Sequence, residues 1–304
     1  MGHSSPLPGF TMDLTIFLQN LAGGLLIGGV YALVGIGLSL IFGVLRIINF
    51  AHGGFVVIGM YAAIALYGGL GIDPYLGALI ALPLGFLLGL LLERTILARL
   101  VDAPPESTLL ATLGLALIIQ NTLQLIFGAE PKSVFVPYGT ATVEFGGITL
   151  SVIQLAAMAI IIVVIVALWL FLTRTETGRA VRATSQNRLG AELVGINTLR
   201  IHGLVFATGL VLAMTAGILL IPQISVTPVI TGPVFTLKAF VVTVLGGLGS
   251  VWGAIGGGLL LGVVEVFGAS YISNGYRDTY GLIAFLAVLL LRPQGLFGRT
   301  VKRV

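Results

Sequence analysis

The sequence predicts an all-α membrane protein, a polytopic bundle of eight to ten transmembrane helices with broken or re-entrant segments. Of its 304 residues, 57% are hydrophobic and only 9% are charged, whereas a soluble domain has about 25% charged residues. The 43 glycines agree, because glycine lets the backbones of membrane helices approach closely. Apolar runs close to the roughly 20 residues that cross a bilayer also recur along the whole chain.

Seven of these runs are predicted as spans on their own. In chain order they are 53–69, 75–92, 107–127, 151–172, 201–221, 251–270 and 280–291. The run 151–172 is the clearest, because it holds no charged residue. The run 280–291 is the shortest, so we expect Asp278 and Thr279 to lie at its interface end.

Two further segments leave the number of helices open. Residues 14–45 carry no charge, and they are either one long tilted helix or two helices broken at Gly23–Gly24 or Gly28–Gly29. Residues 233–249 contain Lys238 and end in three nearby glycines. They are either one span or two half-helices that dip into the membrane.

The distribution of Lys and Arg predicts the orientation in the membrane. Of 15 such residues, these fall on one side: Arg46, Arg94, Arg99, Arg174, Arg179, Arg182, Arg188, Arg200, Arg292, Arg299, Lys302 and Arg303. Lys132 and Arg277 fall on the other. By the positive-inside rule the first side, with the C-terminus, is cytoplasmic. The N-terminus is then external if residues 14–45 form one helix, and the loop 128–150 is external.

The whole chain, residues 1–304, is predicted to form one membrane-spanning domain. The longest polar stretch, 173–200, is too short to bury a core of its own. Residues 1–11, rich in Ser, Pro and Gly, are expected to be a flexible or non-native leader, and they lack the positive region of a signal peptide.

Several classes of function are excluded by composition. The chain has no cysteine and three scattered histidines, so we expect no disulfide, thiolate catalysis or metal site. The basic residues lie in short loops between spans, which argues against nucleic acid as a partner. No Gly-x-x-x-x-Gly-Lys-Ser/Thr phosphate loop is present, so the chain is not expected to bind ATP in the usual way.

The loop 173–200 is the most informative segment. Arg179 and Arg182 are three residues apart and share a helix face, small and apolar residues form a weakly apolar face, and Asn197 is placed to cap the next membrane helix. The pattern predicts one or two short amphipathic helices. Two interpretations remain open: a piece that docks into a partner, or a solvated positive loop.

Three groups of polar residues near or inside the spans also have two interpretations each. Asn49, His52 and Gly53 form either part of a path or gate, as broken helices can, or a tight turn at the interface. Lys238 and Glu265 are the ionisable residues inside apolar segments, where a lone charge costs about 2.5–3.5 kcal/mol. They line a path or subunit contact, or form a structural ion pair. Glu93, at a predicted helix end, is either solvated or paired.

A set of short motifs resembles one family along nearly the whole chain. These are the loop 177–197, Gly29-Val-Tyr-Ala-Leu33, Ile48-Asn-Phe-Ala-His-Gly53, Val244-Leu-Gly-Gly-Leu-Gly-Ser250 and Arg292-Pro-Gln-Gly-Leu296. Their order and spacing resemble the LivH-type permease subunits of branched-chain amino acid ABC importers. The loop 128–150 carries no matching motif.

The resemblance implies a set of partners and a coupling site. Such a permease, in the bacterial inner membrane, pairs with a second permease subunit. Two ATP-binding cassette subunits hold the ATP and Mg²⁺, and a periplasmic or extracellular solute-binding protein delivers the solute. The residues implied in coupling are Gly178, Arg179, Ala180, Arg182, Ala183, Arg188, Leu193, Gly195 and Ile196. The chain itself is then neither an enzyme nor a cofactor-binding protein.

The main alternative is a secondary transporter driven by an ion gradient. That mechanism requires acidic or histidine residues within the membrane, and only Glu265 meets the requirement well. A membrane enzyme lacks its catalytic constellation here. The expected solutes are branched-chain or other hydrophobic amino acids, or related small carboxylic acids.

Overall fold

A computed structural model describes residues 11–101 and 103–297. Of the predicted leader, only Thr11 lies within them, as the first residue of α1. Arg299, Lys302 and Arg303, assigned above to one side, lie outside the described residues.

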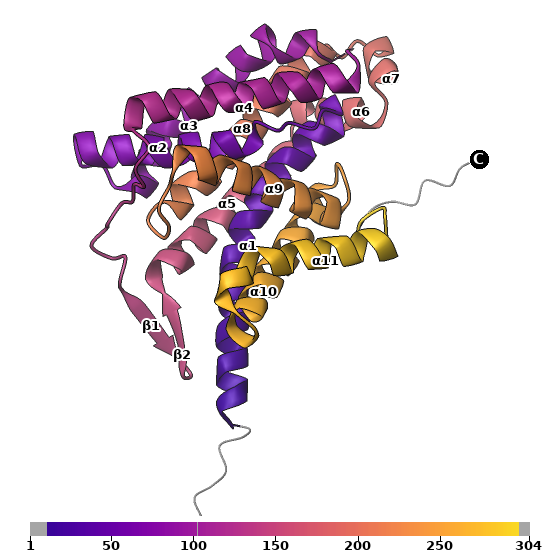
Figure 1. Cartoon of the computed structure of the whole chain (residues 1–304). Helices are drawn as coiled ribbons and strands as arrows, with labels where there is room; N and C mark the ends of the chain where they lie inside the picture. The colour runs from indigo at the N-terminus through magenta and orange to yellow at the C-terminus, as the bar shows by residue number, and fades with distance from the viewer. Residues whose placement is uncertain (1–10, 102, 298–304) are drawn as a thin grey trace, which may run out of the picture.

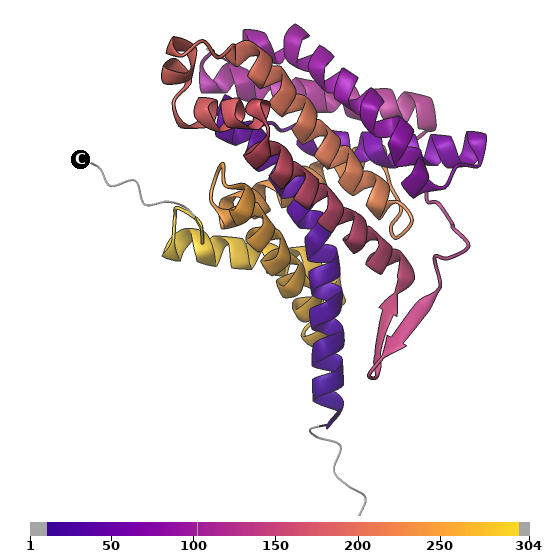
Figure 2. The same cartoon turned by 180° about the vertical axis from the view of Figure 1, so that it is seen from behind.

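The described chain is a helical bundle with one small β-hairpin (Figures 1 and 2). The helices are α1 (Thr11–Leu45), α2 (His52–Leu70), α3 (Pro74–Thr95), α4 (Pro105–Phe127), α5 (Val152–Arg174), α6 (Glu176–Gln186), α7 (Arg188–Leu193), α8 (Thr198–Leu220), α9 (Pro228–Gly246), α10 (Val251–Tyr271) and α11 (Arg277–Leu291). Within residues 11–297, eight helices are long and apolar enough to cross a bilayer. The predicted fold class is therefore confirmed.

α1 is the central helix, and it is continuous. Its 35 residues span about 50 Å, more than the roughly 30 Å of bilayer hydrocarbon. The helix accordingly projects beyond its neighbours at its N-terminal end (Figure 1). Its second half is buried, with Leu33, Ile36 and Ile41 fully enclosed. Of the two alternatives for residues 14–45, the single helix is the observed one.

Glycines allow α10 to pack directly on α1. A Cβ atom at Gly262 would lie 2.4 Å from Cα of Gly28, and one at Gly258 would lie 2.3 Å from the backbone nitrogen of Ala32. Only glycine permits this separation, as in the small-residue interfaces typical of membrane helices.

α9 is also one helix rather than two half-helices. It begins five residues before the predicted start of 233, because Pro228 occupies the first turn, where its missing N–H costs nothing. Pro233 lies within the helix, one turn later, without ending it.

The segment between α4 and α5 contains an element that the sequence analysis did not include. Strands β1 (Thr142–Phe145) and β2 (Ile148–Ser151) pair antiparallel, with Phe145 opposite Ile148. Gly146 and Gly147 have φ of 58° and 83°, as the two central residues of a tight hairpin turn require. The hairpin lies beside the projecting end of α1 (Figures 1 and 2), where the Gln19 side chain pairs with the backbone of Thr149.

The same segment is attached to the rest of this end of the bundle. Lys132 forms an antiparallel bridge with Val226, which precedes α9. The Tyr138 hydroxyl donates a hydrogen bond of 2.5 Å to Asp73, which precedes α3. Burial, followed by the bond to the Asp73 carboxylate, raises the pKa of Tyr138. The segment 128–151 is therefore a fixed cap across several helices.

The basic residues lie at the opposite end of the bundle. Arg46 and Arg188 line one surface cavity there, and Arg94 and Arg200 line another. The first cavity is also lined by residues of the short helices α6 and α7, which lie beyond the C-terminal end of α1 (Figure 1). The second lies between α3 and α8. The described part of the predicted basic side thus lies at one end of the fold.

Candidate functional site

The loop between α5 and α8 folds as two short helices, each with its own cap. The N–H of Gly178 donates to Thr175 Oγ1 at 2.9 Å, at the start of α6. The N–H of Gly190 donates to Asn187 Oδ1 at 2.9 Å, at the start of α7. The predicted cap of α8 is confirmed, since Asn197 Oδ1 accepts from the N–H of Arg200. Short polar side chains therefore end and restart the helix within a few residues.

One face of α6 is buried against the bundle. Gly178, Val181 and Thr184 form this face at helical spacing. A Cβ atom at Gly178 would lie 2.1 Å from the carbonyl oxygen of Phe171, so only glycine allows α6 to pack on the end of α5. Ala180 and Ala183 are half-buried beside this face.

The other face of the segment is exposed. Arg179 and Arg182 both lie on it, as predicted. Arg179 pairs with Glu176 at 3.5 Å, and Arg182 donates to the carbonyl of Leu172 at the end of α5. Leu193 and Val194, at the end of α7, are 80% and 76% exposed. The segment therefore presents both basic and apolar side chains to its surroundings.

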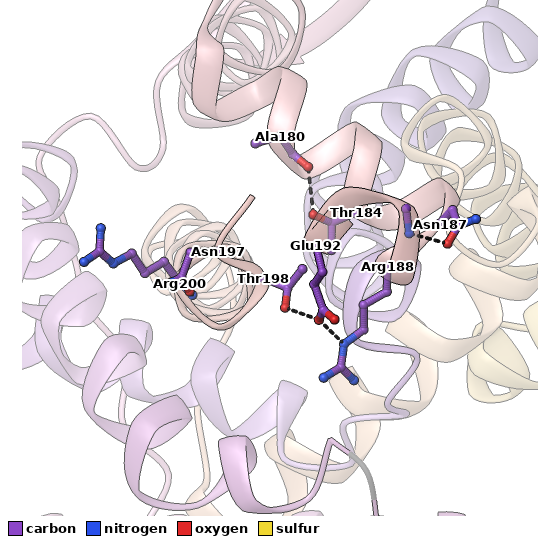
Figure 3. A network of polar contacts seen from close by, with 9 residues as sticks. Ala180, Thr184, Asn187, Arg188, Glu192, Asn197, Thr198 and Arg200 are labelled. Carbon is purple, nitrogen blue, oxygen red and sulfur yellow. Dashed lines mark hydrogen bonds and ion pairs between the residues drawn. The ribbon is translucent and has the colours of Figure 1, made fainter. Parts of the chain in front are cut away.

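A polar network joins α7 to the start of α8 (Figure 3). Glu192 Oε1 accepts from Thr198 Oγ1 at 2.7 Å and from Arg188 Nε at 3.2 Å. Gly195, with φ of 85°, makes the turn between the two helices, and Ile196 then packs against the hydrophobic core. α7 and α8 are therefore joined by side-chain contacts as well as by the intervening turn.

The Asn49–Gly53 segment lies inside the bundle rather than at its surface. Asn49 is 1% exposed, and its Oδ1 accepts from the N–H of Ala51 at 3.0 Å. His52 is fully buried, and its Nε2 lies 3.0 Å from the carbonyl of Val34, in the middle of α1. The N–H of Gly53 donates to Thr236 Oγ1 of α9 at 3.0 Å. α2 thus begins beside the middle of α1 and the first half of α9.

A cavity of about 570 Å³ opens next to this segment, between α2, α4 and α9. Its lining is almost entirely apolar: Phe50, Gly54, Val57, Leu113, Ala116, Leu117, Ile119, Gln120, Leu123, Pro228, Gly232, Pro233, Thr236, Leu237 and Phe240. Gln120 and Thr236 contribute the polar side chains. We call this the α2–α4–α9 cavity. Asn49, His52 and Gly53 support its wall without lining it.

Lys238 and Glu265 form an ion pair between α9 and α10, at 2.5 Å. Lys238 also contacts Asp278 of α11 at 2.8 Å, and Glu265 accepts from the Tyr31 hydroxyl at 2.8 Å and lies 3.7 Å from Arg277. Two acidic and two basic side chains balance within this cluster. It borders a cavity of about 60 Å³ on another side of α9 from the α2–α4–α9 cavity.

Three members of this cluster were not identified from sequence. Tyr31 falls inside an apolar run, and Arg277 and Asp278 were placed at the far interface. These residues meet because glycines let α9, α10 and α11 pack closely together. No sequence pattern shows which residues those glycines contact. Glu93 is a further correction. It is 2% exposed rather than solvated, because α8 packs over the end of α3 at Gly203.

No group of three or more His, Cys, Asp or Glu within residues 11–101 and 103–297 has the geometry of a metal site.

Comparison with known proteins agrees with this architecture. A family described as "Branched-chain amino acid transport system / permease component" matches residues 20–292. The permease protein BraD of the high-affinity branched-chain amino acid transport system of Pseudomonas aeruginosa is 35% identical, over 93% of this chain and 96% of its own. The corresponding LivH of Escherichia coli K12 is 30% identical over the same shares. Among solved structures, PsaBC from Streptococcus pneumoniae in complex with Fab has a similar fold, with TM-score 0.50 and 13% identity over 92% of this chain and 97% of that one.

Proposed function

The chain belongs to the family of permease components of branched-chain amino acid transport systems, and we propose that it forms one half of the membrane pore of an ATP-driven importer. The observation that carries the proposal is the α6–α7 segment. It is held to α5 and α8 on one side and presents Arg179, Arg182, Leu193 and Val194 on the other.

We infer that an ATP-binding cassette subunit docks on this exposed surface. The permease lacks a phosphate loop, so ATP and Mg²⁺ bind to the partner, and closure of two such subunits supplies the energy. Movement of α6 reaches α5 through the tight contact at Gly178. Movement of α7 reaches α8 through the Glu192–Thr198 hydrogen bond. The loop thereby converts a motion outside the membrane into a motion of two spanning helices.

The α2–α4–α9 cavity is the proposed path for the solute. Its apolar walls suit the side chain of a branched-chain or other hydrophobic amino acid, and Gln120 and Thr236 offer hydrogen bonds to its polar end. Asn49, His52 and Gly53 fix the start of α2 beside this path, and we place a gate at this link between α1 and α2. Lys238 and Glu265 hold α9, which forms one wall.

The charge distribution supports a definite orientation in the bacterial inner membrane. Arg46, Arg94 and Arg200 lie at the end that carries α6 and α7, so we place this end and the C-terminus in the cytoplasm. The segment 128–151 then faces outward. It offers a fixed surface to the solute-binding protein. A second permease subunit completes the pore.

The docking of the ATPase is tested by reversing charge on the exposed face. The double variant Arg179→Glu/Arg182→Glu, co-expressed with its partner subunits, should insert normally but recover much less ATPase on purification. Arg174→Glu, at the end of α5, is the matched control and should recover normal amounts. Equal recovery from both variants would remove the α6–α7 surface from the docking site.

A further inference from the structure

The cavity lined by Arg94 and Arg200 lies between the end of α3 and the start of α8, separate from the proposed path. Its volume is about 460 Å³, and Leu90, Glu93 and Arg94 of α3 and Leu199, Arg200 and Leu204 of α8 form much of its lining. It lies at the basic end of the bundle, beside the last turns of α3 and the first turns of α8.

The lining of this cavity includes Glu93, and one of its carboxylate oxygens lacks a donor. Glu93 is 2% exposed, and its Oε1 has no hydrogen-bond partner within the described chain. Gly203 provides the space for it, since a Cβ atom there would lie 3.2 Å from Glu93 Oε2. A buried carboxylate oxygen without a hydrogen bond is costly. An N–H donor from outside the chain would offset this cost.

The rim carries the opposite charge. Arg94 and Arg200 are exposed, and neither forms an ion pair within residues 11–101 and 103–297. Figure 3 shows the side chain of Arg200 extending away from the Arg188–Glu192 pair, so it takes no part in that network. Two guanidinium groups at the mouth of a cavity bind a phosphate well. They also repel a lysine or arginine from a partner protein.

Three leucines give the cavity an apolar wall. Leu199 is 57% exposed, and Leu90 and Leu204 line the cavity beside it. A ligand at this site therefore has an anionic group, an ammonium group that donates hydrogen bonds, and an apolar part. A basic pocket between membrane helices on the cytoplasmic side is also a typical site for a lipid headgroup.

We propose that this cavity binds the headgroup of a phospholipid that carries a primary ammonium group, that is, phosphatidylethanolamine. The phosphate lies between Arg94 and Arg200, the ammonium donates to Glu93, and the acyl chains leave along Leu199. Phosphatidylcholine lacks the N–H donor, and phosphatidylglycerol lacks the cation. The site therefore distinguishes these lipids by whether the headgroup carries an ammonium group with N–H donors.

The proposal is tested by native mass spectrometry of the full chain, purified in mild detergent. Equal amounts of phosphatidylethanolamine, phosphatidylcholine and phosphatidylglycerol with the same acyl chains are added. The unaltered chain should retain phosphatidylethanolamine preferentially. Glu93→Gln should lower the preference over phosphatidylcholine by about tenfold, the effect of losing one charge-assisted hydrogen bond.

A second pair of variants keeps the test independent of folding at the buried position. Arg94→Gln/Arg200→Gln, both exposed, should lower retention of all three lipids, whereas Arg174→Gln should leave it unchanged. Equal retention of the three lipids by the unaltered chain, or a preference unaffected by these substitutions, would overturn the proposal. Loss of a co-purifying protein with unchanged lipid retention would also overturn it and assign the cavity to a protein partner.

Discussion

The ammonium group of Lys238 lies 2.5 Å from Oε1 of Glu265 and 2.8 Å from Oδ1 of Asp278, so that one cation joins α9 to both α10 and α11. The two carboxylates differ in burial. The side chain of Glu265 is 1% exposed and that of Asp278 is 67% exposed. The two contacts are therefore expected to contribute unequally to the free energy of unfolding, by a difference that can be measured.

Glu265→Gln is expected to lower the free energy of unfolding by about 3–5 kcal/mol, the cost of breaking a buried ion pair on one side. Asp278→Asn is the matched control. It should cost about 0.2–1 kcal/mol, because water screens an exposed pair. Thermal unfolding in detergent compares the two variants. Equal midpoints would show that the buried pair does not hold α9 in place.

Gly178→Ala is expected to displace α6 from the end of α5. The new methyl group would lie 2.1 Å from the Phe171 carbonyl oxygen and 2.6 Å from Cα of Leu172, backbone atoms that cannot move freely. Hydrogen exchange should increase across residues 176–186, and ATPase recovery should fall. Gly114→Ala is the control, since a Cβ there has no neighbour within 4 Å. Unchanged exchange in the Gly178 variant would contradict the tight contact.

Ala116→Trp is expected to block the proposed path. An indole directed into a cavity of about 570 Å³ fills much of it, so solute uptake into proteoliposomes should fall by about tenfold or more while subunit assembly is retained. Leu110→Trp, at a position 67% exposed on the same helix, introduces the same side chain outside the cavity and should transport normally. Normal uptake by the Ala116 variant would place the path elsewhere.

Single cysteines at Ser185 and Gly139 are expected to react with an impermeant thiol reagent from opposite sides of the membrane. Ser185 lies in α6, and Gly139 lies in the segment that precedes the hairpin. The chain has no cysteine of its own, so each label has one target. Reaction of both from the same side would contradict the predicted orientation.

Much of the fold could be predicted from hydropathy alone, because a membrane span must satisfy its backbone hydrogen bonds as a helix. Each of the seven predicted runs falls mainly in a helix, and six of these helices are long enough to cross a bilayer. The exception is the run 280–291, because α11 has only 15 residues and is not among the candidate spans. The continuity of residues 14–45 could not be decided in this way. Gly24 and Gly28 are contact points for α10 rather than breaks, and only the position of the neighbouring helix shows the difference.

The hairpin has a recognisable pattern in the sequence. Thr142–Phe145 and Ile148–Ser151 alternate in polarity around Gly146–Gly147, which is typical of a two-residue turn.

The candidate sites were predictable where they depend on local sequence. The cap at Asn197 and the shared helix face of Arg179 and Arg182 follow from the residue types and their helical spacing. The α2–α4–α9 cavity and the burial of Glu93 could not be predicted, because both depend on how closely helices distant in the chain approach.

We propose that this permease works only as part of an ATP-driven complex. The first experiment is mass spectrometry of the proteins that co-purify with it from native membranes in mild detergent. A phosphate-loop ATPase and a second permease subunit should be recovered in fixed proportion to the chain. Recovery of the chain alone, as a monomer or homodimer that transports solute without ATP, would contradict it.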